Sequence, residues 1–300
     1  SMQELFKGGN RPAGHPKTEF KKIAVVGAGL MGAGIAYVQA KAGIPTVLVD
    51  VSKENAEKGK DYSRRLVEKA VSRGKSTQEK GDALLDLITT TDNYDDVKGA
   101  DLVIEAVFEN VELKAKITKM AEAVLDKDAV FGSNTSTLPI TGLAEASERP
   151  ENFIGIHFFS PVERMGLVEI ISGEKTSEAT LAKAVDYVLA IRKTPIAVND
   201  SRGFYTSRCF GTYTREGMEM LAEGIKPAII ENVGRQSGMP MGPLEVSDSV
   251  GLDTALKVTR ATAEAAGIDL QTDDRTQFLA WLVEDQERVG RKAGKGFYDY

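Results

Sequence analysis

The chain has 300 residues, 42% of them hydrophobic, which is long enough for about two globular domains with sizeable cores. Its 38 basic and 44 acidic residues give a net charge of −6, which argues against a general nucleic-acid-binding protein. The single cysteine, Cys209, excludes an internal disulfide framework and favours a reducing, cytoplasmic location, and no apolar run approaches the roughly 18 residues of a membrane span.

Residues 1–20 are interpreted as a linker or as the tail of a preceding domain, because glycines, prolines and lysines gather around the stretch GGNRPAGHP. They contain no apolar segment of the kind found in a secretory signal. Ser1-Met2 is typical of an expression scar, so we expect the chain to be a piece of a longer protein. His15 lies in this segment, and we expect it to be exposed and mobile rather than catalytic.

A dinucleotide-binding pattern follows this segment. A β-branched run over 23–26 predicts a buried parallel strand, residues 30–41 predict a helix, and 46–49 predict a second strand. A G-x-G-x-x-G motif joins the first strand to the helix, and we take these of its residues as cofactor-binding candidates: Gly27, Gly29, Leu30, Met31 and Gly32. A glycine-rich turn without a ligand is the alternative, but the order of the elements favours dinucleotide binding.

Each glycine of this motif has a physical role. Gly27 permits the tight turn, Gly29 lets a pyrophosphate approach the backbone, and Gly32 lets helix and strand pack closely. The helix N-terminus offers free N–H groups and partial positive charge to the phosphates. Asp50 lies 50 − 27 = 23 residues after the first glycine, where a carboxylate can bind the ribose hydroxyls, and Val51 rather than an arginine follows it. We therefore predict NAD rather than NADP.

Strands and helices continue to alternate up to residue 200. Strands are predicted over 88–91, 101–107, 129–133, 153–157, 167–171 and 194–198, and helices over 51–74, 80–87 and 110–125. This alternation predicts a Rossmann-like, doubly wound sheet domain over 21–200. Beyond a boundary near Ser201 the composition has helical periods without a strong strand, so residues 201–300 are predicted to form an all-helical domain.

The predicted helix after Asp50 is unusually basic for an acidic protein. Its basic residues are Lys53, Lys58, Lys60, Arg64, Arg65, Lys69, Arg73 and, just beyond it, Lys75. They form either a solvated helix face or a patch that binds an anionic part of a substrate.

His157 is the histidine with an ordered context, because it ends a predicted strand at the edge where doubly wound sheets bind ligands. If the strands on either side of Pro161 pair antiparallel, Glu169 faces it with Cβ atoms about 5 Å apart. A carboxylate there would orient the imidazole and favour the imidazolium, as general base catalysis requires. A structural histidine at a strand end is the alternative. Ser136 and Asn134 either act at the same edge or cap their loop.

Seven motifs, in this order, make residues 21–300 similar to the L-3-hydroxyacyl-CoA dehydrogenase family: VVGAGLMGAGIA, DLVIEAVFENVELK, SNTSTLPIT, GIHFFSPVERMGLVEII, DSRGFYTSR, MPMGPLEVSDSVGLD and RKAGKGFYDY. The Arg202-Gly203-Phe204-Tyr205 variant and the N-terminal segment most resemble the dehydrogenase part of a multifunctional fatty-acid oxidation protein. An enoyl-CoA hydratase domain comes first in such proteins. We expect no hydratase activity from this chain.

The resemblance implies NAD-dependent oxidation of a (3S)-3-hydroxyacyl-CoA to a 3-oxoacyl-CoA in β-oxidation. It matches His157 with the catalytic base, Glu169 with the acid that orients it, and Ser136 with the serine that contacts the substrate's 3-oxygen. It implies an acyl-CoA partner, no metal, and a helical domain that serves the substrate and pairing into a homodimer. A place in a larger multifunctional chain is the other form in which we expect this dehydrogenase.

Further positions are matched with cofactor contacts, and two depart from the family pattern. Asp50, Glu109 and Lys114 match residues that contact NAD, and we add Ser136 to this group. Ser160 and Ser207 stand where the family often has asparagine, and we keep them as cofactor-binding and catalytic candidates respectively. Two alternatives stay open: a dehydrogenase of another small hydroxy acid, and a non-catalytic NAD-binding module.

Overall fold

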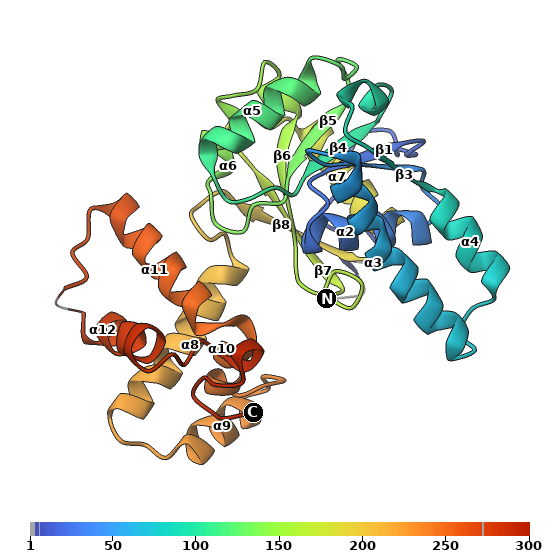
Figure 1. Ribbon diagram of the computed structural model, residues 1–300. Helices are drawn as coiled ribbons and strands as arrows, with labels where there is room; N and C mark the ends of the chain where they lie inside the picture. Colours follow the sequence, from blue (N-terminus) through green and yellow to red (C-terminus); the bar gives the residue numbers. More distant parts are fainter. Residues whose placement is uncertain (1–3, 6, 272) are drawn as a thin grey trace. The chain divides into compact units, whose positions relative to one another are not determined.

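The computed structural model describes residues 4–5, 7–271 and 273–300 (Figure 1). The chain divides into two compact units, Ser1–Tyr205 and Thr206–Tyr300. The first contains the sheet and the second is helical, so the predicted fold class is confirmed.

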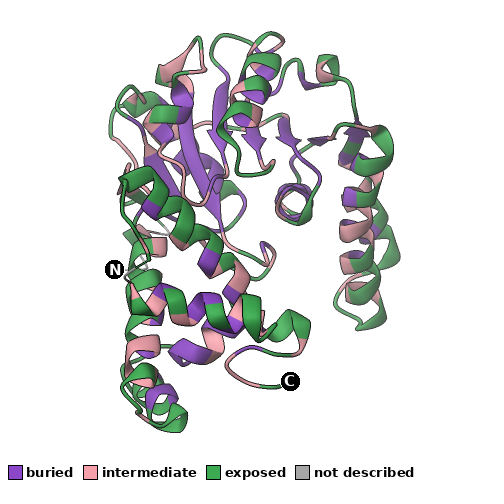
Figure 2. Ribbon diagram, turned by 60° about the vertical axis from the view of Figure 1, so that its left-hand side comes forward, coloured by how far each residue is buried: buried purple, intermediate pink, exposed green. Residues whose placement is uncertain are grey.

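One eight-stranded sheet forms the centre of the first unit. Its strands are β1 (Ile23–Val26), β2 (Thr46–Val49), β3 (Ile88–Thr91), β4 (Leu102–Glu105), β5 (Val130–Ser133), β6 (Phe153–Phe158), β7 (Leu167–Ser172) and β8 (Thr194–Asn199). They lie in the order β3-β2-β1-β4-β5-β6-β7-β8. All neighbours pair in parallel except β6 and β7, which are antiparallel. The strands β1, β2, β4, β5 and β6 are buried along their whole length, as parallel strands covered on both faces must be (Figure 2).

Helices cover both faces of this sheet. They are α2 (Leu30–Lys41), α3 (Lys53–Ser72), α4 (Gln78–Asp86), α5 (Val111–Glu122), α6 (Ile140–Ala144) and α7 (Glu178–Ala190), with short 3₁₀ turns at Tyr94–Val97 and Pro150–Asn152. Alternate residues of β1 show the two faces: Ile23 and Val25 pack with α2 and α7, whereas Ala24 and Val26 pack with α5 and α6.

Side chains decide where several elements begin and end. Ser52 and Asn110 accept hydrogen bonds from the third residue after each of them, so α3 and α5 begin immediately after these residues. The predicted strand over 101–107 is shorter than expected and ends at Glu105. The Val107 N–H donates to the Glu105 carboxylate and so turns the chain away from the sheet.

Part of the N-terminal segment packs on the sheet unit. Both carboxylate oxygens of Asp186 on α7 accept hydrogen bonds from the Arg11 guanidinium, at 2.7 and 3.0 Å. His15, which was expected to be exposed, is half-buried: its side chain is 29% exposed and its Nε2 lies 3.8 Å from Glu178.

The second unit consists of α8 (Thr206–Ala222), α9 (Pro227–Gln236), α10 (Pro243–Val250), α11 (Leu252–Ala266) and α12 (Asp274–Ala280), followed by a π-helical turn at Trp281–Asp285 and a 3₁₀ turn at Arg291–Ala293. Its apolar core includes Leu252 and Leu256 of α11 and Leu279 of α12. Residues 237–242 separate α9 from α10. Among the described residues, no helix is long and apolar enough to cross a membrane.

Candidate functional site

The predicted site residues of the first unit lie at one edge of the sheet, where its parallel strands end. Asp50 follows β2, the glycine turn follows β1, Glu109 lies beyond β4, and Ser136 follows β5. His157 lies at the end of the next strand, β6. The direction of winding reverses between β1 and β4, and ligands bind at such a switch point.

The glycine turn has the shape that a pyrophosphate requires. Gly27 has a φ of +100°, and a Cβ there would lie 2.7 Å from the Ala106 carbonyl oxygen. At Gly32 a Cβ would lie 1.7 Å from the Gly27 carbonyl oxygen, so helix and strand touch backbone to backbone. At Gly29, by contrast, a Cβ would meet nothing within 4 Å. The turn is therefore packed on its protein side and open at the position where the motif is expected to admit a phosphate.

Helix α2 begins at this turn without a side-chain cap. Its N-cap residue is Gly29, whereas α3, α5 and α7 all have an N-cap side chain that accepts a backbone hydrogen bond. Its first turn also contains no acidic residue that would compete with an anion. Leu30 and Met31, the other candidates here, are exposed and half-buried respectively. These features fit the phosphates of a dinucleotide.

Asp50 lies beside the glycine turn as predicted. Its Oδ2 accepts a hydrogen bond of 2.7 Å from the Ala28 N–H, and its Oδ1 accepts one of 2.8 Å from the Val51 N–H. These two donors hold the carboxylate at the end of β2. Exposed apolar side chains lie on the segments around it, since Val51 is 90% and Leu30 59% exposed. An aromatic ligand group that packed there would remove apolar surface from water.

A buried lysine lies between two carboxylates at the end of β4. The Lys114 ammonium is 2.8 Å from Oε1 of Glu105 and 3.2 Å from Oε2 of Glu109. The side chains of Lys114 and Glu105 are 2% and 1% exposed, while that of Glu109 is 38% exposed. Lys114 thus lies behind Glu109 rather than on the surface. Glu105 was not singled out from the sequence, although an acidic residue closing an otherwise apolar strand is a usable signal.

Glu109 also holds the loop after β5. Its Oε1 accepts hydrogen bonds from the Ser136 N–H at 2.6 Å, the Ser136 hydroxyl at 2.9 Å and the Thr135 hydroxyl at 2.9 Å. Burial opposes ionisation of Glu109, but the Lys114 charge and these hydrogen bonds outweigh it, so the pKa of Glu109 lies below its ordinary value. The same loop also contacts strand β6, because the Asn134 side chain accepts a hydrogen bond of 2.9 Å from the Phe158 N–H.

His157 and Glu169 are direct cross-strand partners, so the predicted antiparallel pairing is confirmed. His157 Nδ1 lies 2.8 Å from Oε2 of Glu169. A carboxylate only accepts hydrogen bonds, so Nδ1 carries the proton and Nε2 is the nitrogen left to act as a base. The side chains of His157 and Glu169 are 8% and 0% exposed. The ring of Phe159 packs on the imidazole, with centroids 4.5 Å apart.

Two further candidate serines belong to other segments of the chain. Ser160 is exposed in the loop between β6 and β7. Ser207 belongs to the second unit, where it is half-buried in the first turn of α8. Their proposed roles stay predictions.

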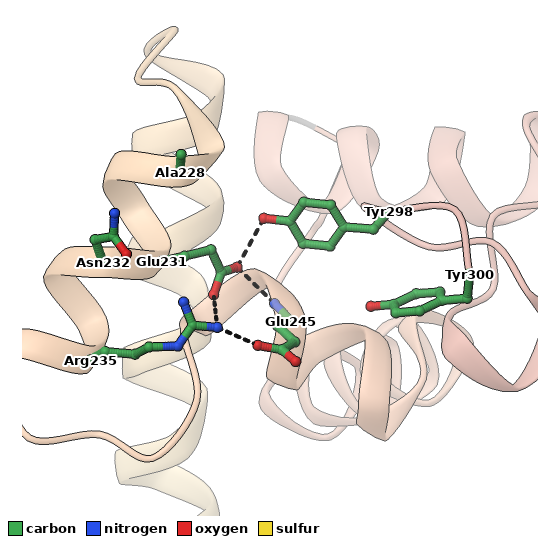
Figure 3. Close-up of a pocket in the computed structure, with 7 residues that line it drawn as sticks. All are labelled: Ala228, Glu231, Asn232, Arg235, Glu245, Tyr298 and Tyr300. Atoms are coloured by element: carbon green, nitrogen blue, oxygen red, sulfur yellow. Dashed lines mark hydrogen bonds and ion pairs between the residues drawn. The ribbon is translucent and has the colours of Figure 1, made fainter.

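A pocket in the second unit contains none of the predicted site residues (Figure 3). Oε1 of Glu231 accepts hydrogen bonds from the Glu245 N–H and the Tyr298 hydroxyl, and Arg235 pairs with Glu245. These contacts join α9, α10 and the C-terminal segment. Desolvation and Asp248 raise the pKa of Tyr300, which also lines the pocket, to about 12. In the described part of the chain, no cluster of three His, Cys, Asp or Glu side chains could hold a metal ion.

Comparisons with known proteins agree with this architecture. The 3-hydroxyacyl-CoA dehydrogenase NAD binding domain matches residues 22–201, and the C-terminal domain of the same family matches residues 203–300. The chain is 44% identical over 283 residues to fatty acid oxidation complex subunit alpha of Idiomarina loihiensis, which covers 94% of this chain and 39% of that protein. It thus spans about two fifths of the length of such curated relatives.

Two solved structures are similar over nearly all of the chain. The (S)-3-hydroxybutyryl-CoA dehydrogenase of Ralstonia eutropha is 34% identical with a TM-score of 0.86, and the similarity covers 94% of this chain and 99% of that one. The 3-hydroxybutyryl-CoA dehydrogenase of Escherichia coli K12 is 32% identical with a TM-score of 0.86, over 94% of this chain and 60% of that one.

Proposed function

This chain belongs to the 3-hydroxyacyl-CoA dehydrogenase family and is an NAD-dependent oxidoreductase, and from that premise we propose that it oxidises a (3S)-3-hydroxyacyl-CoA to the 3-oxoacyl-CoA. The observation that supports this most is the buried His157–Glu169 pair at the same sheet edge as the glycine turn. A nicotinamide acceptor and a general base are the two groups that oxidation of a secondary alcohol needs.

In the proposed reaction, His157 Nε2 takes the proton of the 3-hydroxyl group. The C3 hydride leaves for the nicotinamide, which is the chemistry that the cofactor supplies, and the C–O bond becomes a carbonyl. Glu169 stabilises the imidazolium that forms and holds Nδ1–H in place. In the reverse direction the same imidazolium returns its proton to the oxygen. Ser136 is the proposed contact of the substrate's 3-oxygen; its hydroxyl donates to Glu109 in this structure and would have to turn from Glu109 to donate to the substrate.

The NAD-binding residues are proposed on the same grounds. Gly27, Gly29 and the free N-terminus of α2 would hold the pyrophosphate. Asp50 would bind the ribose hydroxyls and repel a 2′-phosphate. Of Glu105, Lys114 and Glu109, we propose that Glu109 contacts NAD directly, because Lys114 is 2% exposed and already lies between two carboxylates.

A spectrophotometric assay with acetoacetyl-CoA tests the proposal. We expect the protein to oxidise NADH with this substrate and to use NADPH much less, because the proposed contact of Asp50 with the ribose would repel a 2′-phosphate. The same assay with free acetoacetate as substrate distinguishes an acyl-CoA dehydrogenase from a dehydrogenase of another small hydroxy acid. Equal turnover of the free acid and the thioester would contradict acyl-CoA specificity. NADH binding without turnover of acetoacetyl-CoA or of longer 3-oxoacyl-CoA substrates would instead favour the non-catalytic module.

The basic helix α3 is proposed to bind the anionic CoA part of the substrate. Arg64 is neutralised locally by Glu57 and Asp61, and Lys58 by Glu54. The Lys60 ammonium donates to the backbone carbonyl of Ile88. Five other basic side chains of this segment form no ion pair within the described residues: Lys53, Arg65, Lys69, Arg73 and Lys75. These charges remain available for a phosphate.

Salt and charge substitutions on α3 should therefore affect the acyl-CoA more than the cofactor. The triple variant R65Q/K69Q/R73Q is expected to raise the KM for acetoacetyl-CoA about 3–150-fold, from roughly 0.2–1 kcal/mol for each of the three exposed charges, and to flatten its dependence on salt. Substituting exposed lysines of α5, K116Q/K119Q, is the matched control and should change neither KM. A KM for acyl-CoA that is insensitive to both salt and the triple variant would remove α3 from the binding site.

The biological setting is part of the same proposal. Relatives named fatty acid oxidation complex subunit alpha are longer than this chain, which matches only part of them. We propose that the chain acts in β-oxidation as the dehydrogenase part of such a multifunctional protein, in the cytoplasm. A homodimer through the helical unit is the form proposed for the separate chain.

A further inference from the structure

We propose that Phe204 is a positioning residue for the general base pair: its buried ring and left-handed backbone hold the N–H of Tyr205 against Glu169. The chain that leads from the first unit into the second is thereby attached to the carboxylate that orients His157. This inference rests on the proposed function, since it assigns a role in the same reaction.

The backbone at Phe204 has an unusual conformation for a residue with a side chain. Gly203 and Phe204 have φ values of +75° and +49°, and the second is left-handed. For a bulky residue this conformation costs on the order of 1–3 kcal/mol and persists only where the surroundings impose it. Two hydrogen bonds define the turn: Gly203 N–H donates to the Thr137 carbonyl at 3.1 Å, and Phe204 N–H donates to the Ser201 carbonyl at 3.0 Å.

Burial of the Phe204 ring offsets this strain. The residue is 1% exposed and packs in the apolar cluster on the α5 and α6 face of the sheet, together with Phe153 and Ile171. Its ring centroid lies 5.9 Å from that of His157. Burying a phenylalanine side chain contributes about 1.5–3 kcal/mol, which is comparable with the cost of the backbone conformation.

The turn places a donor on the oxygen of Glu169 that does not face the histidine. Tyr205 N–H donates to Oε1 at 3.1 Å, while Oε2 lies 2.8 Å from His157 Nδ1. Glu169 is fully buried, and a buried carboxylate needs hydrogen bonds to its oxygens to stay in place. The Tyr205 N–H therefore helps to fix the carboxylate plane, and through it the direction of the imidazole. Tyr205 is the last residue of the first unit, and α8 begins at the next residue.

Loss of the Phe204 ring should therefore alter catalysis without altering cofactor binding. The Phe204→Ala variant keeps every group that is proposed to touch NAD, but removes the packing that keeps Tyr205 N–H on Glu169. A catalytic group displaced by about 1 Å can cost on the order of 100-fold in rate. We expect kcat to fall about 10–100-fold, with the KM for NADH and its binding constant within about twofold of the parent.

A matched substitution separates positioning from general loss of packing. Phe153 is equally buried in the same apolar cluster, at the start of β6 and away from the site edge. Because both substitutions remove a similar apolar volume, Phe153→Ala should lower the melting temperature about as much as Phe204→Ala. It should nevertheless leave kcat within about threefold of the parent. Phe204→Leu, which keeps apolar bulk at the turn, should recover most of the lost kcat.

The outcomes distinguish this inference from the proposed function. If His157→Ala abolishes turnover but Phe204→Ala retains the parent kcat, the positioning role is refuted and the general base stands. Equal losses of kcat in Phe153→Ala and Phe204→Ala would also refute it. If His157→Ala retains turnover, the general base is wrong and the positioning role falls with it; only a parent protein that does not turn over 3-oxoacyl-CoA substrates would refute the proposed function itself. If Phe204→Ala does not fold, Phe204→Gly takes its place in the comparison with Phe153→Ala, because it removes the ring and adopts the left-handed backbone without strain.

Discussion

Replacing His157 with alanine is expected to lower kcat about 100–10,000-fold, the contribution usual for a positioned general base. Its Nδ1–H is held by Glu169, which leaves Nε2 to take the hydroxyl proton. The glycine turn and Asp50 follow other strands, β1 and β2, so the binding constant for NADH should stay within about twofold. Steady-state kinetics with acetoacetyl-CoA and NADH fluorescence titration measure the two quantities.

Two further variants make this result decisive. Alanine at position 157 removes the partner of a fully buried carboxylate, so part of a loss could come from unfolding. His157→Gln retains an N–H donor for Glu169 but cannot accept the proton, and we expect it to fold and to be as inactive as the alanine variant. His15→Ala, at the chain's other histidine, should retain the parent kcat. A kcat for the His157 variants within a few-fold of the parent would discard the general base.

Replacing Lys114 with methionine is expected to lower the free energy of unfolding by about 3–5 kcal/mol, because it leaves the buried Glu105 carboxylate without its cation. Glu105 is 1% exposed, and its Oε1 is 2.8 Å from the lysine ammonium. Its remaining hydrogen bonds, from the Val107 N–H and the Ser133 hydroxyl, do not neutralise the charge. Urea denaturation at pH 7 measures the loss.

The same variant should show a characteristic pH dependence. In the parent, burial raises the pKa of Glu109, but the Lys114 charge and the hydrogen bonds to Glu109 outweigh it, so the pKa is lowered. This carboxyl therefore stabilises the folded protein fully above its unfolded pKa, and the contribution is lost as the pH falls through its folded pKa. Without the ammonium that contribution is lost. The difference in unfolding free energy between parent and variant should therefore stay constant at pH values well above 4.5, the ordinary pKa of a glutamate, and shrink as the pH falls below it.

Controls for this prediction lie on the same helix and in the same ion pair. Lys116→Met, at an exposed position of α5, should change the unfolding free energy by less than about 0.5 kcal/mol. The double variant E105Q/K114M should be more stable than K114M alone, since neutralising Glu105 removes the uncompensated charge. A Lys114→Met protein as stable as the parent, at every pH, would contradict the buried ion pair.

Much of the sheet unit was predictable because its signals are local. The β-branched run before Gly27, the spacing of the glycines and the acid at position 50 each arise from contacts within about 25 residues. The antiparallel pairing of His157 with Glu169 was also predictable, because a short connection between two strands determines which residues face each other. The predicted boundaries of β4 and α5 were less accurate. The Glu105 side chain ends β4 and the Asn110 side chain begins α5, and neither boundary coincides with a change in composition.

The roles of Glu105 and Phe204 were not predictable in this way. An acidic residue at the end of an apolar strand is a signal for Glu105 itself, but it does not indicate that its partner is Lys114, which lies on the following helix. Nor does the stretch Gly203-Phe204-Tyr205 indicate that a phenylalanine adopts a left-handed conformation and that the next N–H meets a carboxylate 36 residues earlier.

By itself, then, the sequence determined the order of the strands, the helices α2 to α5, the glycine turn and the strand ends at which polar residues gather, because these follow from backbone preference and short-range spacing. It did not indicate α6 or α7. Only the tertiary structure decided that Lys114 lies between two carboxylates and that the segment leading into the helical unit donates to Glu169. Contacts between distant segments depend on how helices and turns pack on the sheet, and that packing is a property of the whole fold rather than of any one stretch.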